Sequence, residues 1–349
     1  MNGNAAGTPA VFFILFIIIR ENAPSGLAPG GRAVLPCLQR SRGGERRMKK
    51  TDRRERGARG LFLSYGLYIL SMLIFGTNGL LVANISLASS QIVLLRTLLG
   101  GAALTVLVLL RGGFDRQAIR AEAGALLLGG AALGANWVAL FEAYRLLNIS
   151  LATLIYYVGP MLILLLSPVL FGEKLTGMKI AALCLVAVGL VCISGSIAFG
   201  GLRLSGLFAA MIAALFYASL IVFNKRITRT GGLQTAAIEL DVAFVVVLAY
   251  VLATTGLPQP RAADLPYIAV IGLVNTGLAY CLYFSGLQKL PGQSVALISY
   301  VDPVSTLVFS ALFLHEAMTP LQLVGGVLIL GGAMFGELRG RQAPTEPTE

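Results

Sequence analysis

Long apolar stretches recur along the chain and are separated by short segments that contain Gly, Pro, Asn or charged side chains. A helix that spans the hydrocarbon core of a membrane needs about 20 consecutive apolar residues. Ten stretches come close to that length, and we expect a spanning helix in each. The predicted spans are residues 61–83, 88–110, 122–143, 150–171, 177–197, 204–224, 235–256, 266–286, 293–314 and 320–337.

Lys and Arg residues lie mostly on one side of these spans, and basic loops near helix ends mark the cytoplasmic side of a membrane protein. One side carries 11 of them against three on the other. The distribution predicts a multi-pass protein of the cell membrane with both termini cytoplasmic. The richer side holds Arg111, Arg116, Arg120, Lys174, Lys179, Lys225, Arg226, Arg229, Lys289, Arg339 and Arg341, and the poorer side holds Arg145, Arg203 and Arg261.

Residues 1–60 form a basic leader that differs from the rest of the chain, and residues 338–349 form a short cytoplasmic tail. The leader contains one apolar run, Pro9 to Ile19, which is too short to span a membrane. Two interpretations stay open: Met48 is the true start, or the leader is a real but disordered tail. Residues 39–59 contain no aromatic side chain, so the positive charge does not indicate nucleic-acid binding.

Composition places the chain outside the soluble globular class and gives no sign of an enzyme. The sequence is 56% hydrophobic and 12% charged, whereas soluble domains are roughly 45–50% apolar and about 25% charged. It has a single histidine and no Cys-x-x-Cys pair, and it lacks the glycine-rich Gly-Lys loop that binds ATP. We expect no cofactor, no metal site and no catalytic residues.

The chain contains an internal repeat. A shift of 143 residues aligns Gly134 with Gly277, and it aligns Trp137, Phe141, Tyr157, Pro160, Glu173, Thr176 and Gly189 with Tyr280, Phe284, Tyr300, Pro303, Glu316, Thr319 and Gly332. Each half has five predicted spans, and an odd number makes the second half enter from the opposite side. The predicted fold is therefore an all-α membrane protein of two inverted five-helix repeats, residues 61–197 and 204–337.

These residues resemble a known family. Phe75-Gly76-Thr77-Asn78, Arg96, and the two segments that run from Pro160 to Thr176 and from Pro303 to Thr319 look like the EamA-type branch of the drug/metabolite transporter superfamily. The resemblance covers residues 61–337 and implies a secondary transporter, often an exporter of amino acids or other metabolites. His315 departs from the glycine that is usual before Glu316, which we interpret as a harmless change at a loop edge.

Polar residues inside the spans are the candidates for a substrate or coupling site. Pro160 and Pro303 fall in mid-span and free the carbonyls of Tyr156 and Ser299, so both helices are expected to break beside a cavity or merely to kink. Asp302 lies near the membrane centre on one face with Ser299, Thr306 and Ser310, and a carboxylate there usually faces a cavity or a partner.

Arg96 lies on the second span, where it extends outward to the membrane surface, faces inward to an anion, or forms a structural ion pair. Glu142 and Asp302 lie at compatible depths for such a pair. The remaining cavity candidates are amides and aromatics on the other spans: Asn78, Trp137, Tyr157, Asn275, Tyr280 and Tyr300.

The sequence thus predicts alternating-access transport of a small molecule, with a coupling proton or other ion. A lipid-linked substrate flippase or a multidrug exporter on the same fold is the main alternative, and a channel or an intramembrane enzyme is a more distant one. Glu173 and Glu316 are expected to cap their loops. Gly332 and Gly336 indicate close helix packing, with a homodimer as one interpretation.

Overall fold

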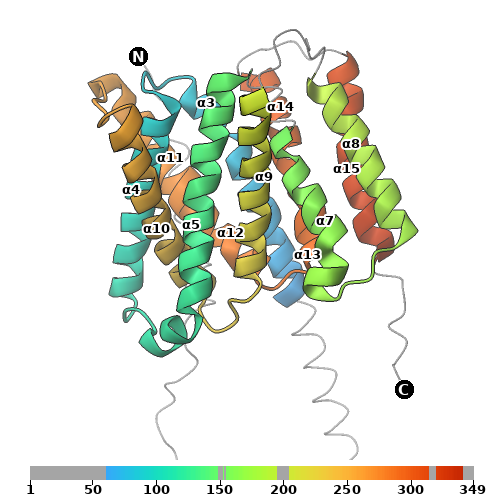
Figure 1. Ribbon diagram of the computed structural model, residues 1–349, viewed down its shortest axis with the longest axis horizontal. Helices are drawn as coiled ribbons and strands as arrows, with labels where there is room; N and C mark the ends of the chain where they lie inside the picture. The colour runs from blue at the N-terminus through green and yellow to red at the C-terminus, as the bar shows by residue number, and fades with distance from the viewer. Residues whose placement is uncertain (1–59, 148–151, 153–154, 195–203, 314–319, 341–349) are drawn as a thin grey trace, which may run out of the picture. The chain divides into compact units, whose positions relative to one another are not determined.

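The computed structural model describes residues 60–147, 152, 155–194, 204–313 and 320–340, and these residues form helices and connecting turns without a strand (Figure 1). All of them belong to one compact unit, Arg53–Glu349. Residues 1–59 of the predicted leader, Glu316 and residues 341–349 of the predicted tail lie outside the described residues.

The helices follow the predicted order of spans closely. Six of them are long and apolar enough to cross a membrane, and three shorter apolar helices accompany them, so the chain is a multi-pass membrane protein. The first helix covers Gly60–Val82 and ends in α3 (Asn78–Val82). The others are α4 (Ser89–Leu110), α5 (Arg116–Leu146), α7 (Val158–Phe171), α8 (Gly177–Ser194), α9 (Leu204–Asn224), α10 (Gly232–Thr254), η1 (Ala262–Asp264), α11 (Leu265–Gly272), the π-helix η2 (Leu273–Leu278), α12 (Ala279–Leu287), α13 (Gly292–Ile298), α14 (Val301–Phe313) and α15 (Pro320–Gly340).

Two predicted spans are interrupted. The ninth is divided into α13 and α14, because Pro303 has no N–H to donate to the carbonyl of Ser299, which accepts a bond from the Asp302 N–H at 3.2 Å instead. The eighth widens into η2, where the hydroxyl of Thr276 donates to the Ile271 carbonyl at 2.8 Å. Single π turns of this kind occur frequently at functional sites.

Successive helices run up and down between two ends of the bundle (Figure 1). We call the end with the turns at 83–88 and 255–261 the upper end, and the end with the turns at 111–115, 172–176, 225–231 and 288–291 the lower end. The described basic residues that the sequence assigns to one side, from Arg111 to Lys289, lie in or next to the lower turns.

Equivalent helices of the two repeats make equivalent contacts. Gly129 and Gly134 bring α5 against α10, and their counterparts 143 residues later, Gly272 and Gly277, bring α11 and η2 against α4. Tyr157 and Tyr300 are also counterparts, and the Tyr300 hydroxyl donates to the Tyr157 carbonyl at 3.0 Å. The two halves therefore pack as symmetry-related units, as a structural repeat requires.

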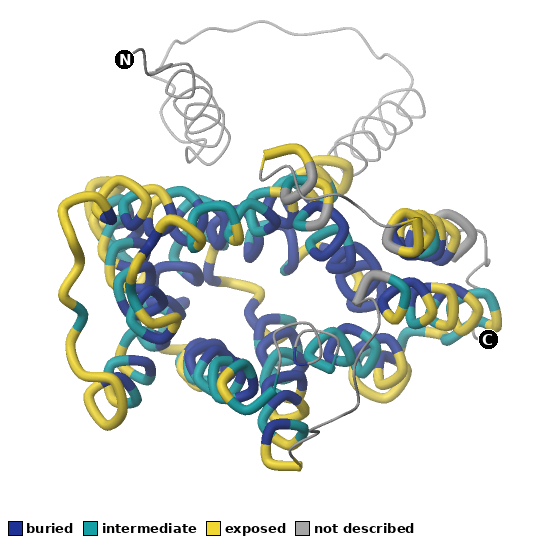
Figure 2. The backbone as a smooth tube through the Cα atoms, turned by 90° about the horizontal axis from the view of Figure 1, so that it is seen from above, coloured by how far each residue is buried: buried dark blue, intermediate teal, exposed yellow. Residues whose placement is uncertain are grey.

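Many large apolar side chains are exposed on the bundle. The exposed parts of the described helices lie mostly toward the outside (Figure 2). Phe62, Val169 and Val327 are more than two-thirds exposed, which suits contact with lipid. Gly332 and Gly336 pack α15 against α8 of the same chain, where a Cβ on Gly332 would lie 3.1 Å from the Ala182 carbonyl oxygen. These glycines serve an internal contact, so the homodimer prediction draws no support from them.

Candidate functional site

A cavity of about 490 Å³ lies among the helices of both repeats. Its volume falls within the range of roughly 300–1,000 Å³ that is usual for small-molecule sites. It reaches the upper end, where two of its lining residues, Gly79 and Ser89, are exposed. Most of the lining is apolar or aromatic, and the polar lining residues are Asn78, Ser89, Arg96, Asn136, Tyr144, Tyr156, Tyr157, Tyr217, Tyr280, Tyr283, Ser299, Asp302 and Thr306.

Arg96 contributes a fixed positive charge to one wall. It projects from α4, it is only 8% exposed, and its Nε donates to the hydroxyl of Thr276 at 2.8 Å. Its guanidinium carbon lies 5.4 Å from the ring centre of Trp137, a cation–π distance. One side of the guanidinium is thus held by η2 and α5, which leaves its remaining N–H groups for a ligand.

Asp302 contributes a carboxylate to another wall, beside the break between α13 and α14. The Tyr157 hydroxyl donates to Asp302 Oδ2 at 3.3 Å, and the hydroxyls of Ser305 and Thr306 donate to the Asp302 backbone carbonyl. Within the described part of the chain, Asp302 and Arg96 form no ion pair with each other or with another side chain. The cavity walls therefore carry a guanidinium and a carboxyl group, and neither is held in an ion pair among the described residues.

A layer of buried hydroxyls closes the lower side of the cavity. The Tyr68 and Tyr217 hydroxyls each lie 2.9 Å from Ser299 Oγ, which in turn donates to the Val295 carbonyl at 2.8 Å. The three side chains come from the first helix, α9 and the end of α13, so this layer ties both repeats together. We call Tyr68, Tyr217 and Ser299 the floor.

Further contacts lie below the floor at the lower end, and those of Glu173 join the repeats. Glu173, which follows α7, accepts bonds from the backbone N–H groups of Gly292 at 2.6 Å and Gln293 at 3.0 Å, and so caps α13. Lys225 Nζ donates to the Leu287 carbonyl at 2.7 Å. Burial lowers the pKa of Lys225 to about 8, and the charge of Glu173 partly opposes that shift.

The structure brings most of the predicted site residues together around the cavity. Asn78, Arg96, Trp137, Tyr157, Pro160, Tyr280, Ser299 and Asp302 all line it. Pro160 and Pro303 occupy the same place in their helices, the third residue of α7 and of α14, where a missing N–H costs no helical bond. Pro303 itself does not line the cavity.

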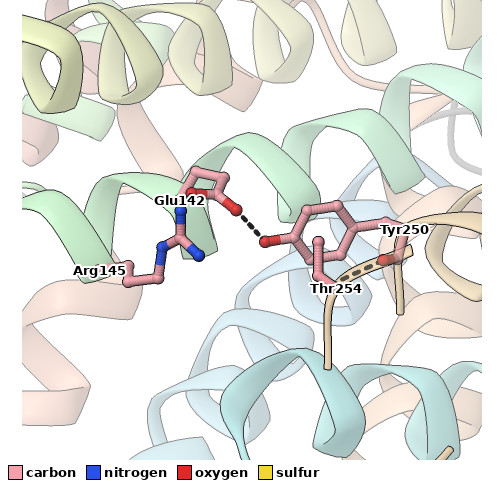
Figure 3. Close-up of polar contacts among 4 residues, drawn as sticks. All are labelled: Glu142, Arg145, Tyr250 and Thr254. Atoms are coloured by element: carbon pink, nitrogen blue, oxygen red, sulfur yellow. Dashed lines mark hydrogen bonds and ion pairs between the residues drawn. The ribbon is translucent and has the colours of Figure 1, made fainter. Parts of the chain in front are cut away.

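Besides Pro303, three predicted residues lie outside the cavity lining. Glu142 is bound to Arg145 at 2.9 Å and to the hydroxyl of Tyr250, so it joins α5 to α10 at the upper end (Figure 3). Asn275 donates to the Ile74 carbonyl at 2.9 Å and to the Thr77 hydroxyl at 2.7 Å, which fixes the end of the first helix. Tyr300 bonds the backbone at Tyr157.

Several cavity residues were not among the sequence candidates, namely Asn136, Tyr156, Tyr217 and Tyr283. Asn136 was detectable, because an amide in the middle of a span is costly unless it is bonded, and it donates to the Ala213 carbonyl at 2.7 Å. The tyrosines carry no such signal, since a tyrosine in a span is equally typical of packing. Among the described residues, no cluster of His, Cys, Asp or Glu suits a metal ion.

Comparison with known proteins places this arrangement in a family. The EamA-like transporter family matches residues 62–195 and, a second time, residues 204–336. The chain is 27% identical over 272 residues to the uncharacterized transporter YxxF of Bacillus subtilis, covering 76% of this chain and 86% of that protein. It is 32% identical over 98 residues to a probable terminal-alkyne amino-acid exporter of Streptantibioticus cattleyicolor, covering 28% of this chain and 33% of the exporter. A crystal structure that is 22% identical shares the fold, with a TM-score of 0.70 over 81% of this chain and 99% of its own.

Proposed function

The chain belongs to the EamA-like transporter family, and on that premise we propose that it is a secondary transporter that exports a small zwitterionic metabolite, an amino acid or a close relative. The observation that carries this proposal is the pair of unpaired opposite charges, Arg96 and Asp302, in the walls of one cavity. A zwitterion carries a carboxylate for the first and an ammonium group for the second. The amino-acid exporter among the relatives supports the same substrate class.

Transport in this proposal follows alternating access between two inverted repeats in a ten-span bundle of the plasma membrane, with both termini in the cytoplasm. The basic lower end is then the cytoplasmic end, and the described conformation is the outward-open one. In that conformation the floor separates the cavity from the cytoplasm. Opening to the cytoplasm requires two sets of contacts to break. These are the contacts of Tyr68 and Tyr217 with Ser299, and the bonds by which Glu173 caps α13.

The lining also supports a second candidate, export of hydrophobic cations. Aromatic side chains dominate the walls, and the ring faces together with Asp302 would favour an organic ammonium compound. The position of Arg96 favours the zwitterion, because the guanidinium attracts a carboxylate, whereas it offers no favourable interaction to a monovalent cation in the same cavity.

A thermal-shift screen of the purified protein separates these candidates, since a ligand that binds only the folded state raises the melting temperature. Amino acids are expected to stabilise the protein, whereas nucleosides, sugars, polyamines and cationic drugs are not. Stabilisation by cationic drugs alone would replace the proposal with the second candidate.

Asp302→Asn provides the matched test in proteoliposomes. The asparagine keeps the shape and removes the charge, so the variant is expected to insert and melt as the wild type does while amino-acid transport falls at least tenfold. Asp241→Asn, the same substitution on α10 outside the cavity lining, is the control and should transport normally. Wild-type transport by a stable Asp302→Asn protein would contradict the assignment.

A further inference from the structure

Glu239 is a fully buried carboxyl group that the proposed substrate cavity does not use. It lies seven residues into α10, about 10 Å along the helix at ~1.5 Å per residue. Its side chain is 0% exposed, and its two oxygens accept bonds from Asn224 Nδ2 at 2.9 and 3.0 Å. Asn224 ends α9 and is also 0% exposed.

No cation accompanies this carboxyl group among the described residues. Each titratable group on the helices around it is otherwise engaged or forms no bond to it. The two basic groups are bonded elsewhere, Arg96 of α4 to Thr276 and Lys225 to the Leu287 carbonyl. The two acidic groups are also bonded elsewhere, Asp241 of α10 to Thr105 and Glu122 of α5 to the backbone at 228–230. Tyr280 and Cys281 of α12 make no bond to Glu239.

A charged carboxylate without a cation is expensive in such a place, whereas a neutral carboxylic acid is not. Burying an ion without a partner costs several kcal/mol even after relaxation. One neutral amide does not offset that cost. The group is therefore expected to carry a proton in the described conformation.

Asn224 can pair with either protonation state of Glu239. Its Oδ1 is buried and has no hydrogen-bond partner. An ionised Glu239 accepts from Asn224 Nδ2, but a neutral Glu239 has an O–H that needs an acceptor. Rotation of the amide by half a turn presents Oδ1 to that O–H. The pair thus has one hydrogen-bonding arrangement for each protonation state.

We infer that Glu239 and Asn224 form the proton-binding site that couples transport to a proton gradient. This inference rests on the proposed transport function and adds the coupling ion and its location. Proton binding converts the Glu239 carboxylate to the acid, whose O–H donates to Asn224 Oδ1, and proton release reverses the step.

The repeat symmetry explains how this site would gain access to water. Position 239 is the counterpart of position 96 in the 143-residue repeat. Arg96 lines the cavity that reaches the upper end, and in an inverted repeat the counterpart lines the cavity when it opens at the other end. Glu239 is then enclosed in the outward-open conformation and meets the cytoplasm in the inward-open one.

The site is also in contact with the substrate cavity. Asn224 Nδ2 donates to the carbonyl of Leu220 at 3.1 Å, and Leu220 lines the cavity just above. Glu239 packs on Gly129 of α5, the helix that carries Asn136 and Trp137. A change in the charge of Glu239 is therefore felt by two helices that form the cavity wall.

Infrared spectroscopy of the purified protein tests the protonated state without any substrate. The wild type is expected to show the C=O stretching band of a protonated carboxylic acid at neutral pH. Glu239→Gln removes that band, because glutamine matches the neutral form in shape, while Asp241→Asn on the same helix retains it. A spectrum that Glu239→Gln leaves unchanged would overturn the inference.

Transport in proteoliposomes tests the coupling, with the amino acid that gives the largest thermal shift as the probe. Glu239→Gln is expected to reduce accumulation driven by a pH gradient at least tenfold, while exchange of labelled for unlabelled amino acid stays at the wild-type level. Accumulation by Glu239→Gln under a pH gradient, or accumulation driven only by sodium, would refute proton coupling at Glu239. If neither the wild type nor any variant exchanges any amino acid, the proposed function is refuted instead. The infrared result would still decide whether Glu239 is protonated.

Discussion

Arg96 and Glu239 occupy equivalent positions in the two repeats, yet their surroundings differ. Arg96 lines a cavity that reaches the upper end and has Thr276 and Trp137 beside it. Glu239 is enclosed between α5, α9 and α10, and among the described side chains Asn224 is the one that bonds it. The repeat thus keeps an ionisable side chain at this position but changes it from a base to an acid. In the proposed transport cycle, the difference in exposure follows from which end of the bundle is closed.

The contacts at the two ends account for that difference. At the lower end, the floor and the Glu173 cap connect the repeats through hydrogen bonds to buried groups. Near the upper end, Glu142 bonds Arg145 and Tyr250, which joins α5 to α10 (Figure 3). These residues lie outside the cavity lining. An open side and a closed side of one symmetric scaffold are what alternating access requires.

The largest expected effect comes from removing the charge on the open side. Arg96→Gln should weaken substrate binding about 30-fold or more, since truncating one partner of a buried charge pair costs roughly 2–5 kcal/mol. Titration calorimetry measures this loss. Arg145→Gln is the control, because Arg145 is 69% exposed and lies outside the lining.

A substrate analogue sharpens the Arg96 experiment. The analogue is the amine that lacks the substrate's carboxylate, so it makes no contact with Arg96. It should therefore bind the wild type and Arg96→Gln with equal affinity. If Arg96 only holds α4 against η2, the variant loses stability and binds both compounds more weakly.

Much of this architecture could be predicted from the sequence, because apolar length and the basic loops are strong signals. The limits of α9 match the predicted sixth span, and the break before Pro303 follows from the chemistry of proline. Glu142 and Asn275 show where such reasoning fails: depth in the membrane does not reveal which way a side chain faces. Glu142 bonds Tyr250 and Asn275 bonds Thr77, and sequence spacing indicates neither partner.

The significance of Glu239 was also hidden from the sequence. The basic loops place residue 239 near the lower end of its span, at a different depth from Arg96. Its isolation becomes visible only in the structure, where Gly129 packs on it, Asn224 bonds it and no cation among the described residues bonds it. A buried carboxyl group is identified by its neighbours, and those neighbours come from helices that are distant in sequence.

A smaller effect is expected at the glycines that let the helices meet. An alanine at Gly129 overlaps Glu239 Oε1, and one at Gly272, its counterpart, lies 2.7 Å from Leu99 Cβ. Each should destabilise the protein by about 1–3 kcal/mol through overpacking, measured by thermal or denaturant unfolding. Gly124→Ala on α5 is the control, since nothing lies within 4 Å, and it should be neutral or slightly stabilising.

The two glycine variants separate the two regions further. Gly129→Ala displaces the carboxyl group and should weaken its infrared acid band, whereas Gly272→Ala should lose stability alone. Equal acid bands in both variants would show that the contact with Gly129 has no influence on Glu239.

The smallest expected effect concerns Lys225, which helps to close the lower end. Burial lowers its pKa to about 8 in the folded protein, whereas a lysine in an unfolded chain titrates near ~10.4. Between these values the unfolded chain binds more protons, so the contribution of Lys225 to stability rises with pH across that interval. Lys225→Met should therefore melt above the wild type at pH 7, with a difference that shrinks as pH approaches 10. Lys289→Met, at an exposed position of the lower end, is the control for the loss of a lysine. A difference between Lys225→Met and the wild type that stays constant with pH would mean that Lys225 stays charged, and that its bond to the Leu287 carbonyl is that of an ordinary cation.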